Sequence, residues 1–154
     1  REKLRKIPGL EKAQYIDPYS AGKGNSIRYL SIARRDNSMK VDGISNLYCG
    51  GEKGAPFIGH TEAVVTGSLA GHNAVRFLKG AEALVLPDTL AVGDIISYSN
   101  ANFKEKEQYG DSYTFAGGVF FERMKERNLY TTDVNSIANR VETAGLSGIF
   151  EKNL

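Results

Sequence analysis

Glycines between an expected strand and an expected helix are the residues best suited to bring this backbone close to a ligand. Gly50 and Gly51 follow the apolar stretch 46–49, and Gly59 precedes a run with helical spacing. A helix N-terminus offers unpaired N–H groups and a partial positive charge, which favour an electron-rich ligand. Glycine removes the Cβ that would hold the ligand away. The pattern predicts a concave surface flanked by Gly50, Gly51 and Gly59, with a helix that begins between Gly59 and Thr61.

The segment GAPFIGHT, residues 54–61, approaches the phosphate-binding loop Gly-x4-Gly-Lys-Thr without matching it. His60 stands where that motif has its lysine, and Pro56 lacks an N–H that a phosphate cradle would use. These departures argue against a nucleoside triphosphatase. A phosphate- or nucleotide-binding protein that uses only the helix N-terminus stays open as an alternative.

Few other side chains are placed for catalysis. His60 and His72 are separated by three helical turns, about 18 Å along one helix, so we predict no metal site. Cys49 is the sole cysteine and lies in an apolar stretch, which favours a structural role over a redox one. Glu52 and Glu62 are possible acid–base groups, but Glu62 in a first helical turn fits a complement to the helix dipole better.

The elements that must position these residues follow from periodicity and turn signals. Strands are expected at 27–33 and 46–49. A long helix is expected from His60 to Leu78, with a stripe of small residues that another backbone should approach closely: Gly67, Ala70, Gly71 and Ala74. Further helices are expected after a Thr89 cap through about Tyr98 and from Val119 to Arg127, with a polar loop at 100–113. A last helix is expected to begin at an Asp133 cap and end near Gly145.

Composition places the chain among ordinary globular proteins. It has 154 residues and a formal net charge of +2, which by itself indicates neither nucleic acid nor a membrane as partner. Two basic groups, residues 1–6 and Arg34–Arg35, are interpreted as solvated faces rather than RNA contacts. The single cysteine and the lack of a long apolar run predict a cytoplasmic protein without a membrane partner.

The stretch from Cys49 to Ala74 resembles the second cofactor-binding segment of the GidA/TrmFO group of FAD-dependent tRNA-modifying proteins. The matching motifs are Cys-Gly-Gly-Glu at 49–52, Gly-His-Thr-Glu-Ala at 59–63, and Gly-Ser-Leu-Ala-Gly-His-Asn-Ala at 67–74. Residues 86–98 also resemble the folate-dependent branch, so the resemblance covers about residues 40–100. The group's Gly-x-Gly-x-x-Gly fingerprint does not occur in this chain, which indicates the C-terminal part of a longer flavoprotein.

This resemblance implies FAD as the cofactor, the remainder of the parent flavoprotein as a partner, and tRNA as a substrate of the parent. It places Gly50, Gly51 and Glu52 along the cofactor chain, and a second set near the flavin ring: Gly59, His60, Thr61, Glu62 and Ala63. It does not assign catalytic residues.

Together the patterns predict an α+β fold. Residues 1–80 would form a partial FAD-binding segment of short strands and the helix at 60–78, and residues 81–154 would form a mostly helical subdomain. The predicted function is the flavin-ring side of an FAD-dependent oxidoreductase. A second alternative is a non-catalytic helical interaction module with a vestigial cofactor loop.

Overall fold

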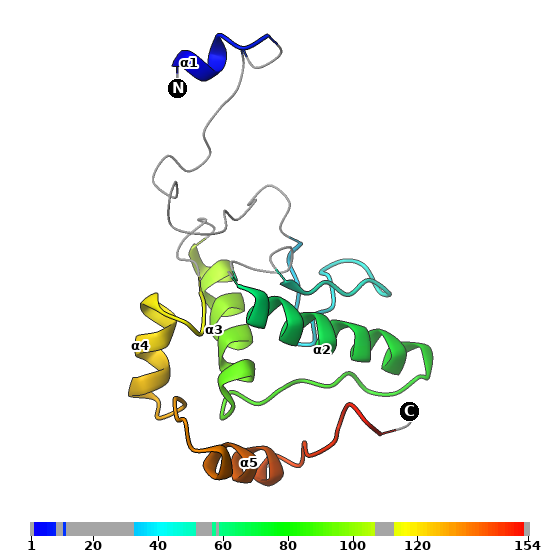
Figure 1. Cartoon of the computed structure of the whole chain (residues 1–154). Helices are drawn as coiled ribbons and strands as arrows, with labels where there is room; N and C mark the ends of the chain where they lie inside the picture. Colours follow the sequence, from blue (N-terminus) through cyan, green and yellow to red (C-terminus); the bar gives the residue numbers. More distant parts are fainter. Residues whose placement is uncertain are drawn as a thin grey trace.

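Helices account for most of the regular structure of this chain. The computed structural model describes residues 2–8, 11, 33–51, 57, 59–106 and 113–152. Figure 1 shows α3 and α4 beside each other, with α5 following them along the chain. The helices of the described residues are α1 (Glu2–Arg5), α2 (His60–Leu78), α3 (Ala91–Lys106), α4 (Gly118–Glu126) and α5 (Val134–Thr143).

One hydrophobic core joins the segment before α2 to three of the helices. Phe57, Leu69, Ile95 and Phe120 are at most 1% exposed and belong to the same packed cluster. Leu69 comes from α2, Ile95 from α3 and Phe120 from α4. The middle of α2 is therefore held against α3 and α4 by apolar packing. The division of the chain at residue 80 stays a prediction.

The predicted α+β fold is wrong, because the described residues contain no β-strand. The segment 33–51 forms only isolated β-bridges, including Arg35 with Val41 and Lys40 with Tyr48. The chain turns too often for a ladder to extend: Met39 and Gly43 both have positive φ, at 71° and 78°. The expected strand at 46–49 therefore reduces to a single bridge. The expected strand at 27–33 lies almost wholly outside the described residues, and Ala33 is not in a strand.

The helix predictions were more accurate than the strand predictions. α2 has the predicted bounds, and α4 lies within one residue of its predicted limits. Asp133 is the N-cap of α5, and its side chain accepts a hydrogen bond from the N–H of Asn135. α3 is the exception, since it begins at Ala91 and runs to Lys106 through residues that were expected to form a loop.

Polar residues inside α3 explain this error. Ser99 is fully buried and donates its hydroxyl to the carbonyl of Ile96 at 3.0 Å. Asn100 donates to the side-chain oxygen of Asn37 at 2.8 Å. Each polar side chain thus has a partner within the fold, so the polar sequence does not end the helix.

Candidate functional site

The first turn of α2 is an open helix start. Gly59 occupies the N-cap position with φ of 134° and without a side-chain capping bond. His60 and Thr61 are exposed. The first backbone bond of the turn joins the N–H of Ala63 to the carbonyl of Gly59 at 3.1 Å. Within the described residues, no capping side chain covers this helix start, which leaves N–H donors that can receive an electron-rich group.

Glu62 is turned toward the protein rather than toward solvent. It is 3% exposed, and its Oε1 accepts a hydrogen bond from the N–H of Phe115 at 2.6 Å. A Cβ at Gly59 would collide with Oε2 of the same carboxylate. Gly59 is therefore required both for its backbone conformation and for the space that Glu62 fills. The carboxylate complements the helix dipole, as the sequence suggested, and anchors the loop that leads into α4.

Gly50 and Gly51 fix the preceding segment onto α2. A Cβ at Gly50 would lie 2.6 Å from the Cα of Gly67, so only glycine fits there. The N–H of Gly51 donates to the hydroxyl of Thr66 at 2.7 Å, and that hydroxyl donates to the carbonyl of Glu62 at 2.7 Å. The sequence predicted that these glycines bring the backbone close to a ligand. In the structure they bring it close to α2.

Part of the predicted site lines one groove. Gly50, Gly51 and Ala63 line it together with the small residues of α2, among them Gly67 and Ala74. The group at the helix start does not belong to that lining: Gly59, His60, Thr61 and Glu62. The predicted concave surface therefore includes the first glycine pair and leaves out Gly59. Glu52, the remaining predicted contact, lies outside the described residues.

The small-residue stripe makes only part of the close contact that was predicted for it. Gly67 meets the backbone of Gly50, and Ala70 is 6% exposed within the core cluster. At Gly71 the prediction is wrong, since a Cβ there would meet no atom within 4 Å. A glycine is therefore required where Gly50 meets Gly67, but not at Gly71.

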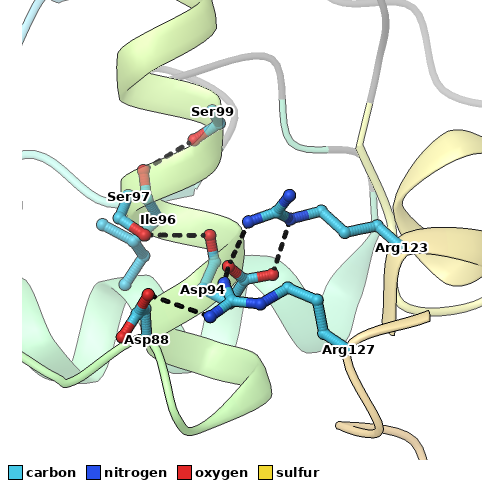
Figure 2. Close-up of polar contacts among 7 residues, drawn as sticks. All are labelled: Asp88, Asp94, Ile96, Ser97, Ser99, Arg123 and Arg127. Carbon is cyan, nitrogen blue, oxygen red and sulfur yellow. Dashed lines mark hydrogen bonds and ion pairs between the residues drawn. The ribbon is translucent and has the colours of Figure 1, made fainter. Parts of the chain in front are cut away.

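The sequence did not indicate several buried polar side chains of this fold. The first is a carboxylate on α3, Asp94. Asp94 is 0% exposed and accepts hydrogen bonds from Arg123 of α4 and from Arg127, the C-cap residue of α4, as Figure 2 shows. Arg127 also pairs with Asp88 at 3.0 Å. Two arginines one helical turn apart were the available signal, because they imply an acidic partner on a neighbouring element. Both acids and both bases of this cluster are paired, so its role is structural: it joins α3 to α4.

Asn73 is a second buried polar residue that was not singled out. Its Nδ2 donates to the carbonyls of Ser38 and Leu84, each at 2.8 Å, and its Oδ1 accepts from the N–H of Leu84 at 2.7 Å. The side chain is fully buried. It therefore ties α2 to the turn that contains Ser38 and to the segment that contains Leu84.

Arg35 and His72 carry buried nitrogens that have no hydrogen-bond partner among the described residues. Arg35 is 2% exposed, which corrects the interpretation of the Arg34–Arg35 pair as a solvated face. The ring of His72 makes an edge contact with Phe150 at a centroid distance of 5.0 Å. Burial, and then the charge of Arg76, lower the pKa of His72 below its ordinary value.

The described residues contain neither a metal-binding cluster nor a membrane-spanning helix. No three side chains of His, Cys, Asp or Glu in those residues are grouped closely enough to hold a metal ion. None of the helices in the same residues has the length and apolar character required to cross a bilayer.

Comparison with known proteins gives relatives that are much longer than this chain. The methylenetetrahydrofolate–tRNA-(uracil-5-)-methyltransferase TrmFO of Streptococcus sanguinis is 34% identical over 93 residues, which cover 60% of this chain and 20% of that protein. The Bacillus pumilus protein of the same name is 30% identical over 108 residues, 70% of this chain and 24% of the relative. The Bacillus cytotoxicus one is 29% identical over 134 residues, 73% of this chain and 30% of the relative. The chain thus spans no more than three tenths of these relatives, and no solved structure matches it.

A family model covers the half of the chain that carries the glycine junction. The model of glucose inhibited division protein A matches residues 1–82, a range that contains Gly50, Gly51 and the whole of α2. The curated relatives carry the name TrmFO, in agreement with the resemblance of this segment to the GidA/TrmFO group. The chain belongs to the glucose inhibited division protein A family.

Proposed function

We propose that this chain supplies the flavin-ring side of an FAD site in an oxidoreductase that modifies uridine in tRNA. The family match and the names of the relatives, which specify methylation of a tRNA uracil, support the reaction class. The observation that carries the proposal is the glycine junction, where Gly50 packs on Gly67 and the uncapped start of α2 follows. Bound FAD would supply the redox chemistry, and these residues would position it.

The described residues fit a flavin better than a phosphate. The exposed first turn of α2 offers backbone N–H donors, with the side chains of His60 and Thr61 beside them. The carboxylate of Glu62 lies against the same turn, where it would repel a dianionic phosphate. A neutral oxidised ring, which needs donors to its carbonyl and nitrogen atoms, avoids most of that repulsion. This argues against the phosphate-binding alternative.

Separate roles follow for the residues that the resemblance places at the cofactor. We propose that Gly59, His60 and Thr61 lie against the ring, and that Gly50, Gly51 and Ala63 shape the groove beside it. Glu52 is proposed as a contact to the cofactor chain on the resemblance alone. Glu62 acts through the position of Phe115 and the helix start, because its carboxylate already has a partner in the fold.

The full-length parent protein provides the test. Purified from its natural reading frame, it should show the visible absorbance of oxidised flavin in stoichiometric amount. The variants His60→Ala and Thr61→Val change exposed side chains at the helix start, and we expect them to weaken flavin retention without lowering thermal stability. Val64→Ala is the matched control, because Val64 is 67% exposed on the same helix one turn later. A parent protein without flavin, or variants that hold it as the wild type does, would contradict the proposal.

A further inference from the structure

Within the part of the chain that the structure describes, Arg35 is a buried cation without a hydrogen-bonding partner. It is 2% exposed, and none of its three guanidinium nitrogens makes a hydrogen bond. The guanidinium carbon lies 4.9 Å from the centre of the Phe57 ring, which is itself fully buried. An aromatic face compensates part of the charge, but it satisfies none of the N–H donors in the guanidinium plane.

Three carboxylates of the described residues already have hydrogen-bonding partners other than Arg35. Asp36, the next residue along the chain, accepts from the N–H and the hydroxyl of Ser38 and from the N–H of Lys40. Glu62 accepts from Phe115, and Asp94 accepts from Arg123 and Arg127. No salt bridge within the described residues includes Arg35.

Burial makes this arrangement costly unless an anion is present. Desolvation lowers the pKa of Arg35 to about 10, against smaller opposing effects of Cys49 and Asp36. The side chain therefore remains charged at neutral pH. A buried charge without a counter-charge is strongly unfavourable, and a planar guanidinium is suited to bind a carboxylate or phosphate through two parallel hydrogen bonds.

We propose that Arg35 is the anchor of an oxyanion site that takes a small ligand bearing a phosphate or a carboxylate group. The guanidinium carbon lies over the Phe57 ring, and the anion would accept two N–H groups in the guanidinium plane. The flavin proposal is not required for this inference, since the site rests on the burial and free donors of Arg35.

The two ligand classes are tested with inorganic phosphate and with acetate. Thermal unfolding of the chain is measured in each anion against chloride at matched ionic strength. An anion at about 20 times its dissociation constant should raise the melting temperature by about 4–7 °C for a domain of this size. A response to phosphate alone assigns the phosphate class, and a response to acetate alone assigns the carboxylate class.

Variants show whether Arg35 is responsible. Arg35→Met removes the donors while keeping much of the apolar volume, and it should abolish the response to anions. Arg34→Met is the matched control at the exposed neighbouring arginine, and it should retain the response. If Arg35→Met does not unfold cooperatively, Arg35→Lys takes its place. Phosphate and acetate are then titrated calorimetrically into the wild type and into Arg35→Lys, and we expect the variant to bind the anion at least tenfold more weakly.

Two results would overturn the proposal. One is a wild-type melting temperature that neither anion changes. This result counts against the site even if Arg35→Met is less stable than the wild type in chloride, because that loss would then reflect a partner within the chain. The other is a response of Arg35→Met equal to that of the wild type.

Discussion

Arg123 holds Asp94 through two parallel hydrogen bonds, from Nε at 2.9 Å and from Nη2 at 2.8 Å. The carboxylate is 0% exposed, and the guanidinium carbon of Arg123 lies 4.1 Å from the centre of the Tyr98 ring. The bonds to Asp94 are the largest cause that raises the pKa of Arg123. Figure 2 shows that Arg127 also contacts this carboxylate, so one acid of α3 binds a base of α4 and the base at its C-cap.

Asp94→Asn should therefore destabilise the fold severely. The amide keeps the volume but faces two arginines with its NH2 group, and breaking a buried pair of this kind costs about 3–5 kcal/mol. Chemical denaturation measures the difference in the free energy of unfolding. Asp88→Asn is the control, because Asp88 pairs with Arg127 at the surface and its loss should cost no more than about 1 kcal/mol. Equal effects of the two substitutions would show that burial of Asp94 is not the decisive factor.

Two glycine-to-alanine substitutions should change stability in opposite directions. At Gly50 the added methyl group would press on the backbone of Gly67, and overpacking of this kind costs about 1–3 kcal/mol. At Gly71 the space is open within a helix, so alanine should stabilise by about 0.5–1 kcal/mol. Thermal and urea unfolding of both variants provide the comparison. A neutral Gly50→Ala would mean that the segment before α2 can move away from the helix without cost.

Acidification should destabilise the protein through His72. Its folded-state pKa is lowered from 6.5, so between the two values the unfolded chain binds more protons than the folded one. Stability therefore rises with pH across that window and is lost as pH falls from 6.5 through the lowered pKa.

His72→Phe keeps a ring against Phe150 and removes the titrating nitrogen. Its melting temperature should fall less than that of the wild type on acidification from neutral pH. Val75→Ala, three residues after His72 on α2, should retain the wild-type slope. Parallel slopes for His72→Phe and the wild type would assign the acid sensitivity to other groups.

The chain by itself should not retain FAD, whereas the parent protein should. The Gly-x-Gly-x-x-Gly cradle for the pyrophosphate is absent from these residues, and one helix N-terminus contributes only about 0.3–1 kcal/mol. Micromolar binding requires about 8 kcal/mol. We expect a colourless preparation whose melting temperature does not change when FAD is added. A yellow preparation with stoichiometric flavin would place the whole cofactor site within these residues.

Local sequence signals predicted the helices of this fold because the residues that begin and end a helix lie next to it in the sequence. Asp133 caps α5, and Gly145 follows its end with φ of 68°, as the two residue types suggested. Strands depend on partners elsewhere in the chain, which a local pattern does not supply. The apolar run at 46–49 has strand composition, but the turns at Met39 and Gly43 leave it with one bridge.

The candidate site could be located from sequence more readily than it could be explained. The glycine motif correctly placed the start of α2, but not the reason for Gly50, which is its contact with Gly67. Arg35 was unpredictable, because a basic pair in a polar segment is usually solvated and burial depends on the residues that fold over it.

The amide of Asn73 determines the register of a segment that has no strand partner within the described residues. Residues 81–87 are extended and largely apolar, so hydrophobic contact alone would tolerate several alignments along α2. Only one alignment presents both the N–H and the carbonyl of Leu84 to that amide. A slip by one residue would leave the buried amide unpaired, at a cost of about 1–3 kcal/mol. Because the same side chain also holds Ser38, one residue excludes misaligned forms of two segments that lie 11 and 35 residues from it in sequence.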